Sequence, residues 1–337
     1  MSIEILGITV LWVFLYGYVI VASIDFGAGF FAYYGRVTGK EHVISHIISR
    51  YLSPVWEVTN VFFVFFFVGL VGFFPDAAYY YGTALLIPGS IALILLAIRG
   101  SFYAFGNYGS KDNSFYLFLY GATGLLIPAA LSTALTISEG GFIEEQGNKV
   151  IFLAGELVSS PYSWSVVILA IVSVLFISAV FLTYYADRAG DTPARDLLRT
   201  FALFWSPPTI LASFLVFASL REHNERHFNN ALEIWWMFGL SLLCFLAAML
   251  MVYKKKRFGT SFILVMLQFF FAFFGYGASH LPYILDPFIT IYSGYTNPEM
   301  GMALVAAFIA GLLLLIPSLI LLMRLFLFNA DYVKGEK

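Results

Sequence analysis

The sequence has 337 residues, of which 61% are hydrophobic and only 11% carry a charge. Soluble domains contain about 25% charged residues, so a soluble globular fold is excluded and lipid is the expected solvent of this chain. The formal net charge of −2 provides no basic surface for nucleic acid. The single cysteine, Cys244, excludes a disulfide framework.

Nine apolar segments are long enough to cross a bilayer as helices, each of which needs about 20 residues. Helices are expected because a chain in hydrocarbon must satisfy all its backbone polar groups internally. The segments cover approximately residues 5–34, 54–74, 77–98, 115–137, 163–186, 200–220, 232–253, 259–279 and 302–328. The predicted fold is therefore all-α, a polytopic membrane protein with nine transmembrane helices.

Residues 41–52, between the first two segments, have a different pattern. Their sequence, "EHVISHIISRYL", gathers Val43, Ile44, Ile47 and Ile48 on one helical face and polar residues elsewhere. This pattern predicts a short amphipathic helix that lies in the inner membrane interface.

The connecting segments divide the chain into four regions. Helices 1–4 are expected within residues 1–137, and an acidic outer loop follows at 138–162. Helices 5–8 are expected within 163–279, and residues 280–337 hold an outer loop, the ninth helix and an inner tail. The helix count alone suggests two four-helix groups plus one peripheral helix.

The basic residues predict the orientation of the chain in the membrane. With the N-terminus outside, 15 of the 18 Lys and Arg residues fall on the inner side. The three on the outer side are Lys149, Arg221 and Arg226. Since short inner loops are enriched in Lys and Arg, this split predicts an outer N-terminus and a cytoplasmic C-terminus.

Asp25 lies inside the first apolar segment, in the stretch "VASIDFGAGFFAYYGR" of residues 21–36. A charge at the centre of a membrane helix costs roughly 2.5–3.5 kcal/mol on insertion scales. Gly27 and Gly29 follow it and let a neighbouring helix approach closely. Two interpretations remain: a structural aspartate paired with a buried partner, or a proton carrier or a group near a cofactor. Intramembrane acids favour the functional interpretation.

The second segment begins with "LSPVWEVTNVFF", residues 52–63. Glu57 has a simple explanation as an acid near a helix start, and Trp56 as a residue of the interfacial aromatic belt. Thr59 and Asn60, however, add two more polar side chains to the start of an otherwise apolar span, which is the pattern expected at the mouth of a proton path. The predicted proton-pathway candidates are Glu57, Asp25, Thr59 and Asn60.

Arg99 stands at the expected inner end of the third helix. Arginines at such positions commonly extend to the lipid headgroups. The alternative is a buried pair with Asp25, because both residues belong to the inner half of the first three helices. Either way, Arg99 and Trp56 are expected to have electrostatic or structural roles, since an arginine does not release its proton.

The histidines all lie outside the middle of the predicted spans. They are His42, His46, His223, His227 and His280. A haem held within this chain would need axial ligands at depth, where only methionines and Cys244 are available. We therefore expect no haem and no metal on the side chains of this chain, and we interpret the two pairs with i, i+4 spacing as loop residues. A metal site at these pairs is the less favoured alternative.

Several motifs, in this order and spacing, resemble the second subunit of cytochrome bd quinol oxidase. They are "SIDFGAG", "LSPVWEVTNVF", "FFPDAAYYYGTALLIP" and "LAIRGSFYAF" within residues 1–110, and "HLPYILDPFITIYSGYTNPEMGMAL" at 280–304. The sequence departs from the family where Asp-Gly-Asn commonly follows the tryptophan of helix 2. Here Trp56 is followed by Glu57, Val58 and Thr59, and a family glycine-rich stretch is replaced by "FFVFFF".

The resemblance implies a complex that oxidises membrane quinol and reduces dioxygen to water. Haem b and haem d would be carried by subunit I, a separate chain of similar nine-helix fold. The present chain would be the haem-free subunit II, which stabilises subunit I and contributes to an inner-side proton pathway. It would have no catalytic residue in the redox sense and would not be catalytic alone.

The expected partners are subunit I, membrane lipid and, through the complex, membrane quinol. A small extra subunit is left open, and no nucleic acid is expected. The expected location is the inner (cytoplasmic) cell membrane. Two other classes compete with this interpretation: a secondary transporter, and a structural subunit of another membrane complex. The two halves of the chain lack the matching helix interruptions that are typical of transporters.

Overall fold

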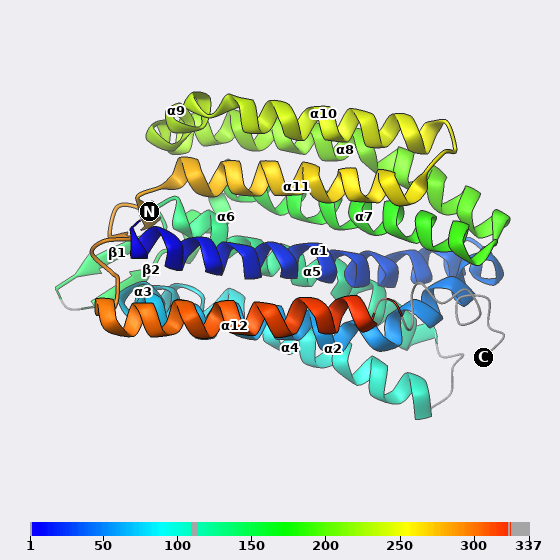
Figure 1. The fold of residues 1–337 in the computed structure, drawn as a ribbon, viewed down its shortest axis with the longest axis horizontal. Coiled ribbons are helices and arrows are strands. Elements are labelled where there is room, and N and C mark those ends of the chain that lie inside the picture. The colour runs from blue at the N-terminus through cyan, green and yellow to red at the C-terminus, as the bar shows by residue number, and fades with distance from the viewer. Residues whose placement is uncertain (1, 109–113, 148, 323, 325–337) are drawn as a thin grey trace.

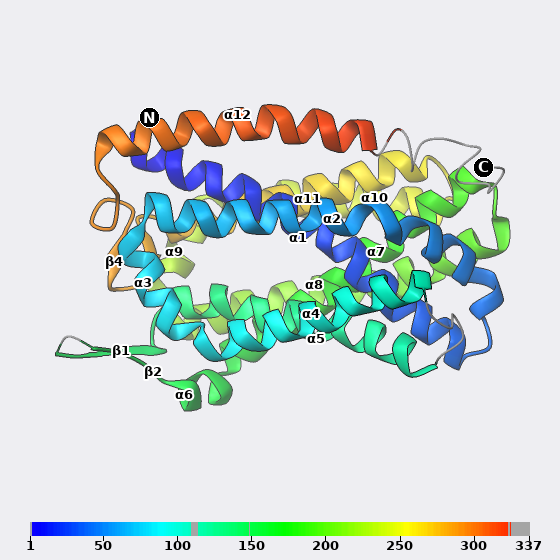
Figure 2. The same cartoon turned by 90° about the horizontal axis from the view of Figure 1, so that it is seen from below.

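The computed structural model describes residues 2–108, 114–147, 149–322 and 324. Within these ranges, the side chains of residue 322, of 102–108 and of most of 41–58 lie outside the described set. Long helices lie side by side along the longest axis of the molecule (Figures 1 and 2). The small strands gather at the end where α1 begins.

The described helices are α1 (Ile3–Val37), α2 (Glu41–Phe73), α3 (Pro75–Ala84), α4 (Leu86–Tyr108), α5 (Ser114–Ser138), α6 (Ala154–Ser159), α7 (Pro161–Ala189), α8 (Thr192–His223), α9 (Glu225–Glu233), α10 (Trp235–Tyr253), α11 (Phe258–His280) and α12 (Pro298–Leu322). Two short antiparallel hairpins pair β1 (Ile143–Gln146) with β2 (Lys149–Phe152) and β3 (Tyr283–Leu285) with β4 (Ile289–Thr290). The prediction of an all-α membrane protein is confirmed.

Among the described residues, seven helices are long and apolar enough to cross a membrane: α1, α5, α7, α8, α10, α11 and α12. The pair α3 and α4 would form an eighth span, bent by 79°. The described apolar part of α2, Thr59–Phe73, is shorter. Large apolar side chains such as Phe204, Trp235 and Leu314 are exposed on outer faces, as expected for surfaces that meet lipid or another apolar chain.

The third predicted helix, expected as one element over residues 77–98, is broken between α3 and α4. Pro88 explains the position of the break, because proline lacks the N–H that would bond the carbonyl of Ala84, and its ring collides with that carbonyl. Residue 88 therefore fits only the first turn of a new helix. Beyond the break, α4 continues to Tyr108, ten residues past the expected end.

The segment 41–52 is the first part of α2 rather than a separate helix, since α2 is continuous from Glu41 to Phe73. Ile47 and Ile48 are buried in a core cluster that also contains Ile20 and Ile24 of α1. The apolar face of the segment is thus turned at least partly toward the protein. Its position in the membrane interface stays a prediction.

The centre of the molecule is α1, which contacts α2, α5, α7, α11 and α12. Glycines let two of these backbones come close. A Cβ atom on Gly27 would lie 2.4 Å from Cβ of Ser178 in α7. A Cβ on Gly124 of α5 would lie 2.2 Å from the carbonyl oxygen of Phe26. These contacts are closer than any real Cβ makes, so only glycine fits there.

Helices α1 and α2 run antiparallel with a regular register. A Cβ on Gly69 would lie 2.3 Å from a methyl carbon of Leu11, and the rings of Tyr18 and Phe63 have centroids 4.9 Å apart. In both pairs the two residue numbers add up to about 80. This register tells which residue of α2 lies at the same depth in the bundle as a given residue of α1.

The close contact of α5 with α1 gives a prediction. Gly124→Ala should destabilise the protein by about 1–3 kcal/mol, because the new methyl group overlaps a backbone oxygen that cannot move independently. Gly82→Ala in α3 is the matched control, since nothing lies within 4 Å of its added Cβ. The measurement is the thermal midpoint of the detergent-solubilised protein. Equal midpoints for Gly124→Ala and the parent would contradict the close contact.

Candidate functional site

Two clusters of buried polar side chains stand out among the described residues. The first, the Asp25 cluster, consists of Asp25, Arg99, Tyr120 and Thr123 and joins α1, α4 and α5. The second, the Glu139 cluster, consists of Glu139, Asn224, His227, Tyr276, Ser279 and His280. It lies at the end of the molecule where α1 begins. Buried polar groups of this kind must be satisfied by one another.

Arg99 and Asp25 form a buried ion pair at the core of the first cluster. Nε of Arg99 donates a hydrogen bond to Oδ2 of Asp25 at 2.9 Å, and Nη2 donates to the backbone carbonyl of Asp25 at 2.6 Å. Arg99 is fully buried and Asp25 is 2% exposed. Interpreting Arg99 as an arginine that extends to the headgroups is therefore wrong, because α4 continues past it and its side chain turns into the bundle.

The other two members of the cluster complete the hydrogen bonding. The Tyr120 hydroxyl donates to Oδ1 of Asp25 at 3.1 Å. Nη1 of Arg99 donates to the Tyr120 carbonyl at 2.8 Å and reaches the Thr123 hydroxyl at 3.4 Å. The guanidinium carbon also lies 4.1 Å from the centroid of the Tyr120 ring, a cation–π contact. These contacts thus connect three helices.

Gly29 makes room for this arrangement. A Cβ there would lie 2.7 Å from the Tyr120 carbonyl oxygen and 3.1 Å from Nη1 of Arg99. Gly29 was expected to let a neighbouring helix approach closely. The residues that pack against it, Arg99 and Tyr120, are the ones that bind Asp25.

The residues at the start of the second predicted span are only partly within the described set. Thr59 is buried and Asn60 is half-buried on α2. The side chains of Trp56 and Glu57 lie outside the described residues, as do those of His42 and His46. The roles assigned to Glu57, Asp25, Thr59 and Asn60 in a proton pathway, and to Arg99 and Trp56, stay predictions.

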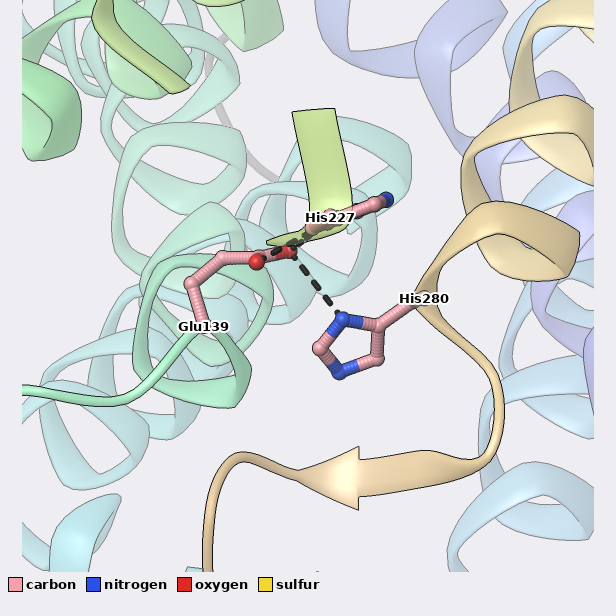
Figure 3. Close-up of side chains that lie close together, drawn as sticks. All are labelled: Glu139, His227 and His280. Atoms are coloured by element: carbon pink, nitrogen blue, oxygen red, sulfur yellow. Dashed lines mark hydrogen bonds and ion pairs between the residues drawn. The ribbon is translucent and has the colours of Figure 1, made fainter. Parts of the chain in front are cut away.

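Glu139 follows directly after α5 and is the centre of the second cluster (Figure 3). Its carboxylate is 2.8 and 2.9 Å from Nδ1 of His227, accepts a hydrogen bond from Nδ2 of Asn224 at 3.0 Å, and accepts another from the Tyr276 hydroxyl. Burial raises the pKa of Glu139, but the hydrogen bonds and charges of the facing histidines lower it by more, so the pKa lies below its usual value. The group is therefore a carboxylate at neutral pH.

The two histidines of the cluster differ in their bonding. Nε2 of His227 lies 2.7 Å from the Ser279 hydroxyl, which in turn lies 2.9 Å from the backbone carbonyls of Gly275 and Tyr276. His280 has Nδ1 at 3.4 Å from a Glu139 oxygen, but neither ring nitrogen has a hydrogen-bond partner among the described residues. The ligand atoms of Glu139, His227 and His280 all lie within 4.8 Å of one another, so these three residues could hold a metal ion.

The helices correct the expectation that His223 and His227 are loop residues. His223 ends α8, His227 lies within α9 and His280 ends α11. His223 does not join the cluster but stacks between the rings of Phe142 and Tyr162. Sequence spacing could not reveal the cluster, because Glu139 is 88 residues from His227 and no periodicity connects them.

The Asp25 cluster gives a second prediction. Asp25→Leu and Arg99→Leu should each cost about 3–5 kcal/mol, because each leaves one buried charge without its partner. The double variant removes both charges and should recover much of the loss. The measurement is the yield of monodisperse protein after detergent extraction.

A control comes from the partly exposed pair of Arg195 and Asp187, which lies 3.4 Å apart. Asp187→Asn should change the yield little, because exposed pairs contribute about 0–1 kcal/mol. If the double variant of Asp25 and Arg99 gave a yield no higher than the worse single variant, the two charges would not depend on each other.

Comparison with known proteins agrees with the fold and the sequence motifs. The family model of cytochrome bd terminal oxidase subunit II matches residues 3–326. A protein of Bacillus subtilis (strain 168), described as a putative cytochrome bd menaquinol oxidase subunit II, is 33% identical over 342 aligned positions, covering 99% of this chain and 98% of the relative. The solved structure of bd oxidase from Geobacillus thermodenitrificans contains a chain that is 60% identical, with a TM-score of 0.86, covering 98% of this chain and 100% of that chain.

These matches extend over nearly the whole chain, beyond the motifs of residues 1–110. They do not support the secondary transporter or the structural subunit of an unrelated complex. The chain belongs to the family of cytochrome bd terminal oxidase subunit II, and it is a subunit of a quinol oxidase complex.

Proposed function

We propose that this subunit carries no haem on its own side chains, crosses the cell membrane nine times with its N-terminus outside, and contributes to a proton route from the inner side toward the haems of its partner subunit. The observation that carries the proposal is the register of α1 and α2, which relates the depth of Glu57 to that of the Asp25 cluster. The complex supplies the redox chemistry, and this chain supplies structure and proton access.

The placement of histidines supports haem binding by the partner alone. The three histidines with described side chains, His223, His227 and His280, all lie at the end of the molecule where α1 begins. None occupies the middle of a described span, where a haem would need an axial ligand. The described spans thus offer no histidine to a haem, which supports assigning haem b and haem d to the partner subunit.

The distribution of charge supports nine spans and an outer N-terminus. Helix α2 has 33 residues, which is enough to cross, and would be the ninth span beside the bent pair of α3 and α4. Basic residues gather at the end of the bundle opposite the start of α1: Arg188, Arg195, Arg199, Lys254, Lys255, Lys256 and Arg257. That end is the cytoplasmic side in our proposal. The exposed apolar faces of the outer helices also leave room for a small extra subunit.

The antiparallel register supports a link between Glu57 and Asp25. Since paired residue numbers in α1 and α2 add up to about 80, backbone position 57 corresponds in depth to residue 23 of α1. That is two residues, or about 3 Å along the helix axis, from Asp25. Two acidic residues at similar backbone depths on neighbouring helices are suited to a proton path that enters from the inner side.

The two carboxylates would have different tasks. Both oxygens of Asp25 accept hydrogen bonds from Arg99 or Tyr120, which suits a fixed charge that positions the helices. Glu57 is then the group that takes up and releases protons, because Arg99, the other charged candidate, stays protonated. Buried Thr59 and half-buried Asn60 follow on the same helix and offer polar neighbours along the path.

Substitution of Glu57 tests the relay. Glu57→Gln keeps the shape but removes the titrating group, so oxygen consumption per haem d should fall while assembly and the haem spectrum survive. Glu57→Asp should retain substantial activity. Glu299→Gln is a matched control, because Glu299 is an exposed acid in the first turn of α12. Parent-like turnover of Glu57→Gln would leave Glu57 as a helix-start acid and nothing more.

Reporter fusions test the orientation separately. A reporter joined after Lys337 should be active only in the cytoplasm, and one inserted at Gly147, in the turn of the β1–β2 hairpin, only outside. Activity of the Lys337 fusion on the outer side would overturn the proposed topology without affecting the family assignment.

A further inference from the structure

The Glu139 cluster brings together three potential metal ligands from segments far apart in the sequence. Glu139 follows α5, His227 lies in α9 and His280 ends α11, and the three side chains point toward one another (Figure 3). All are at least nine-tenths buried. We propose that Glu139, His227 and His280 form a binding site for a divalent transition-metal ion, with Zn²⁺ the best match.

The ligand set and its spacing suit zinc. Two imidazoles and one carboxylate are a common set for Zn²⁺, with one position left for water or another oxygen. Bonds of about 2.0–2.1 Å at tetrahedral angles separate the ligand atoms by about 3.3 Å. Nδ1 of His280 is already 3.4 Å from Oε1 of Glu139. Nδ1 of His227 is 2.8 Å away, so this contact would open by about half an ångström to admit the ion.

The surroundings of His227 fit a metal ligand. Its Nε2 faces the Ser279 hydroxyl, which can donate its own hydrogen to a backbone carbonyl 2.9 Å away. The hydroxyl therefore accepts from Nε2, and Nε2 carries a hydrogen. Histidines that bind metals commonly donate their second N–H in this manner, which fixes the ring and leaves the other nitrogen for the ion. In His227 that other nitrogen, Nδ1, is the one that faces Glu139.

His280 provides the independent observation. His280 is 7% exposed, yet neither ring nitrogen has a hydrogen-bond partner among the residues that the structure describes. A buried imidazole without a partner loses the hydrogen bonds that it makes with water. A metal ion between His280 and Glu139 would restore one strong interaction to the ring.

The local charge also accommodates a cation. The carboxyl group of Glu139 faces both imidazoles, and the nearby Asp286 is paired with Arg226, while Asn224 donates to both acids. Binding of Zn²⁺ would displace any proton on Nδ1 of His227 to solvent, and the Zn–N and Zn–O bonds would replace the His227–Glu139 contact. The Tyr276 hydroxyl, which lies against Glu139, or a water molecule would provide the fourth ligand.

The test uses the purified oxidase complex. After dialysis against a chelator, the complex is equilibrated with Zn²⁺, and bound zinc is counted by elemental mass spectrometry. The parent should bind one more equivalent than His280→Ala or Glu139→Gln, or bind it at least ten-fold more tightly. His223→Gln is the matched control, because this histidine lies at the same end but outside the cluster, and it should keep the parent stoichiometry. His280→Ala should assemble, since it removes no hydrogen bond within the described residues.

A second measurement does not depend on any variant. X-ray absorption at the zinc edge of the parent should show two imidazole nitrogens and one or two oxygens at about 2.0–2.1 Å, undisturbed by haem iron. Added Zn²⁺ should also raise the thermal midpoint of the parent and of His223→Gln but not of His280→Ala. Equal zinc content in the parent and His280→Ala, or a zinc edge without two imidazoles, would overturn the site and leave the cluster as an ion pair.

Discussion

The arrangement of the first half of this subunit depends on the buried pair of Arg99 and Asp25. Burying either charge alone would cost several kcal/mol, so the two helices that carry them must stay in register. Tyr120 and Thr123 extend the constraint to α5, and Gly29 and Gly124 remove the side chains that would otherwise hold the backbones apart. Charge, hydrogen bonding and the absence of two Cβ atoms therefore act on the same contact.

The second buried cluster is built on a different principle. In the Asp25 cluster both charged groups have hydrogen-bond partners, whereas the Glu139 cluster leaves one imidazole without a hydrogen bond among the described residues. The Asp25 cluster therefore resembles a structural ion pair, and the Glu139 cluster resembles a binding site without its ligand. Both connect segments that are distant in sequence, but only the first joins helices through their middle parts.

The sequence predicted the features that depend on composition and local pattern. The all-α membrane class followed from the apolar segments, and the low charge made Asp25 conspicuous. The buried partner of Asp25 could be named as an alternative because the topology brings residue 99 to the same half of the bundle. The Glu139 cluster could not be found, because hydrogen-bond partners 88 residues apart leave no periodic signal. Pro88 predicts a kink in this segment, but the size of the bend between α3 and α4, 79°, could not be predicted, because a single proline is tolerated in many apolar helices.

That break has a consequence for depth. On one straight helix from Pro75, Arg99 would lie about 36 Å from the start, close to the far headgroups. Because α3 turns away by 79°, only the 13 helical steps from Leu86 to Arg99 run along the axis of α4, a length of about 20 Å. The bend thus shortens the distance that α3 and α4 cover along the axis of α4. Arg99 therefore lies at the depth of the Asp25 carboxylate and not at the membrane surface. An uninterrupted helix of the same sequence length would carry the arginine past its partner.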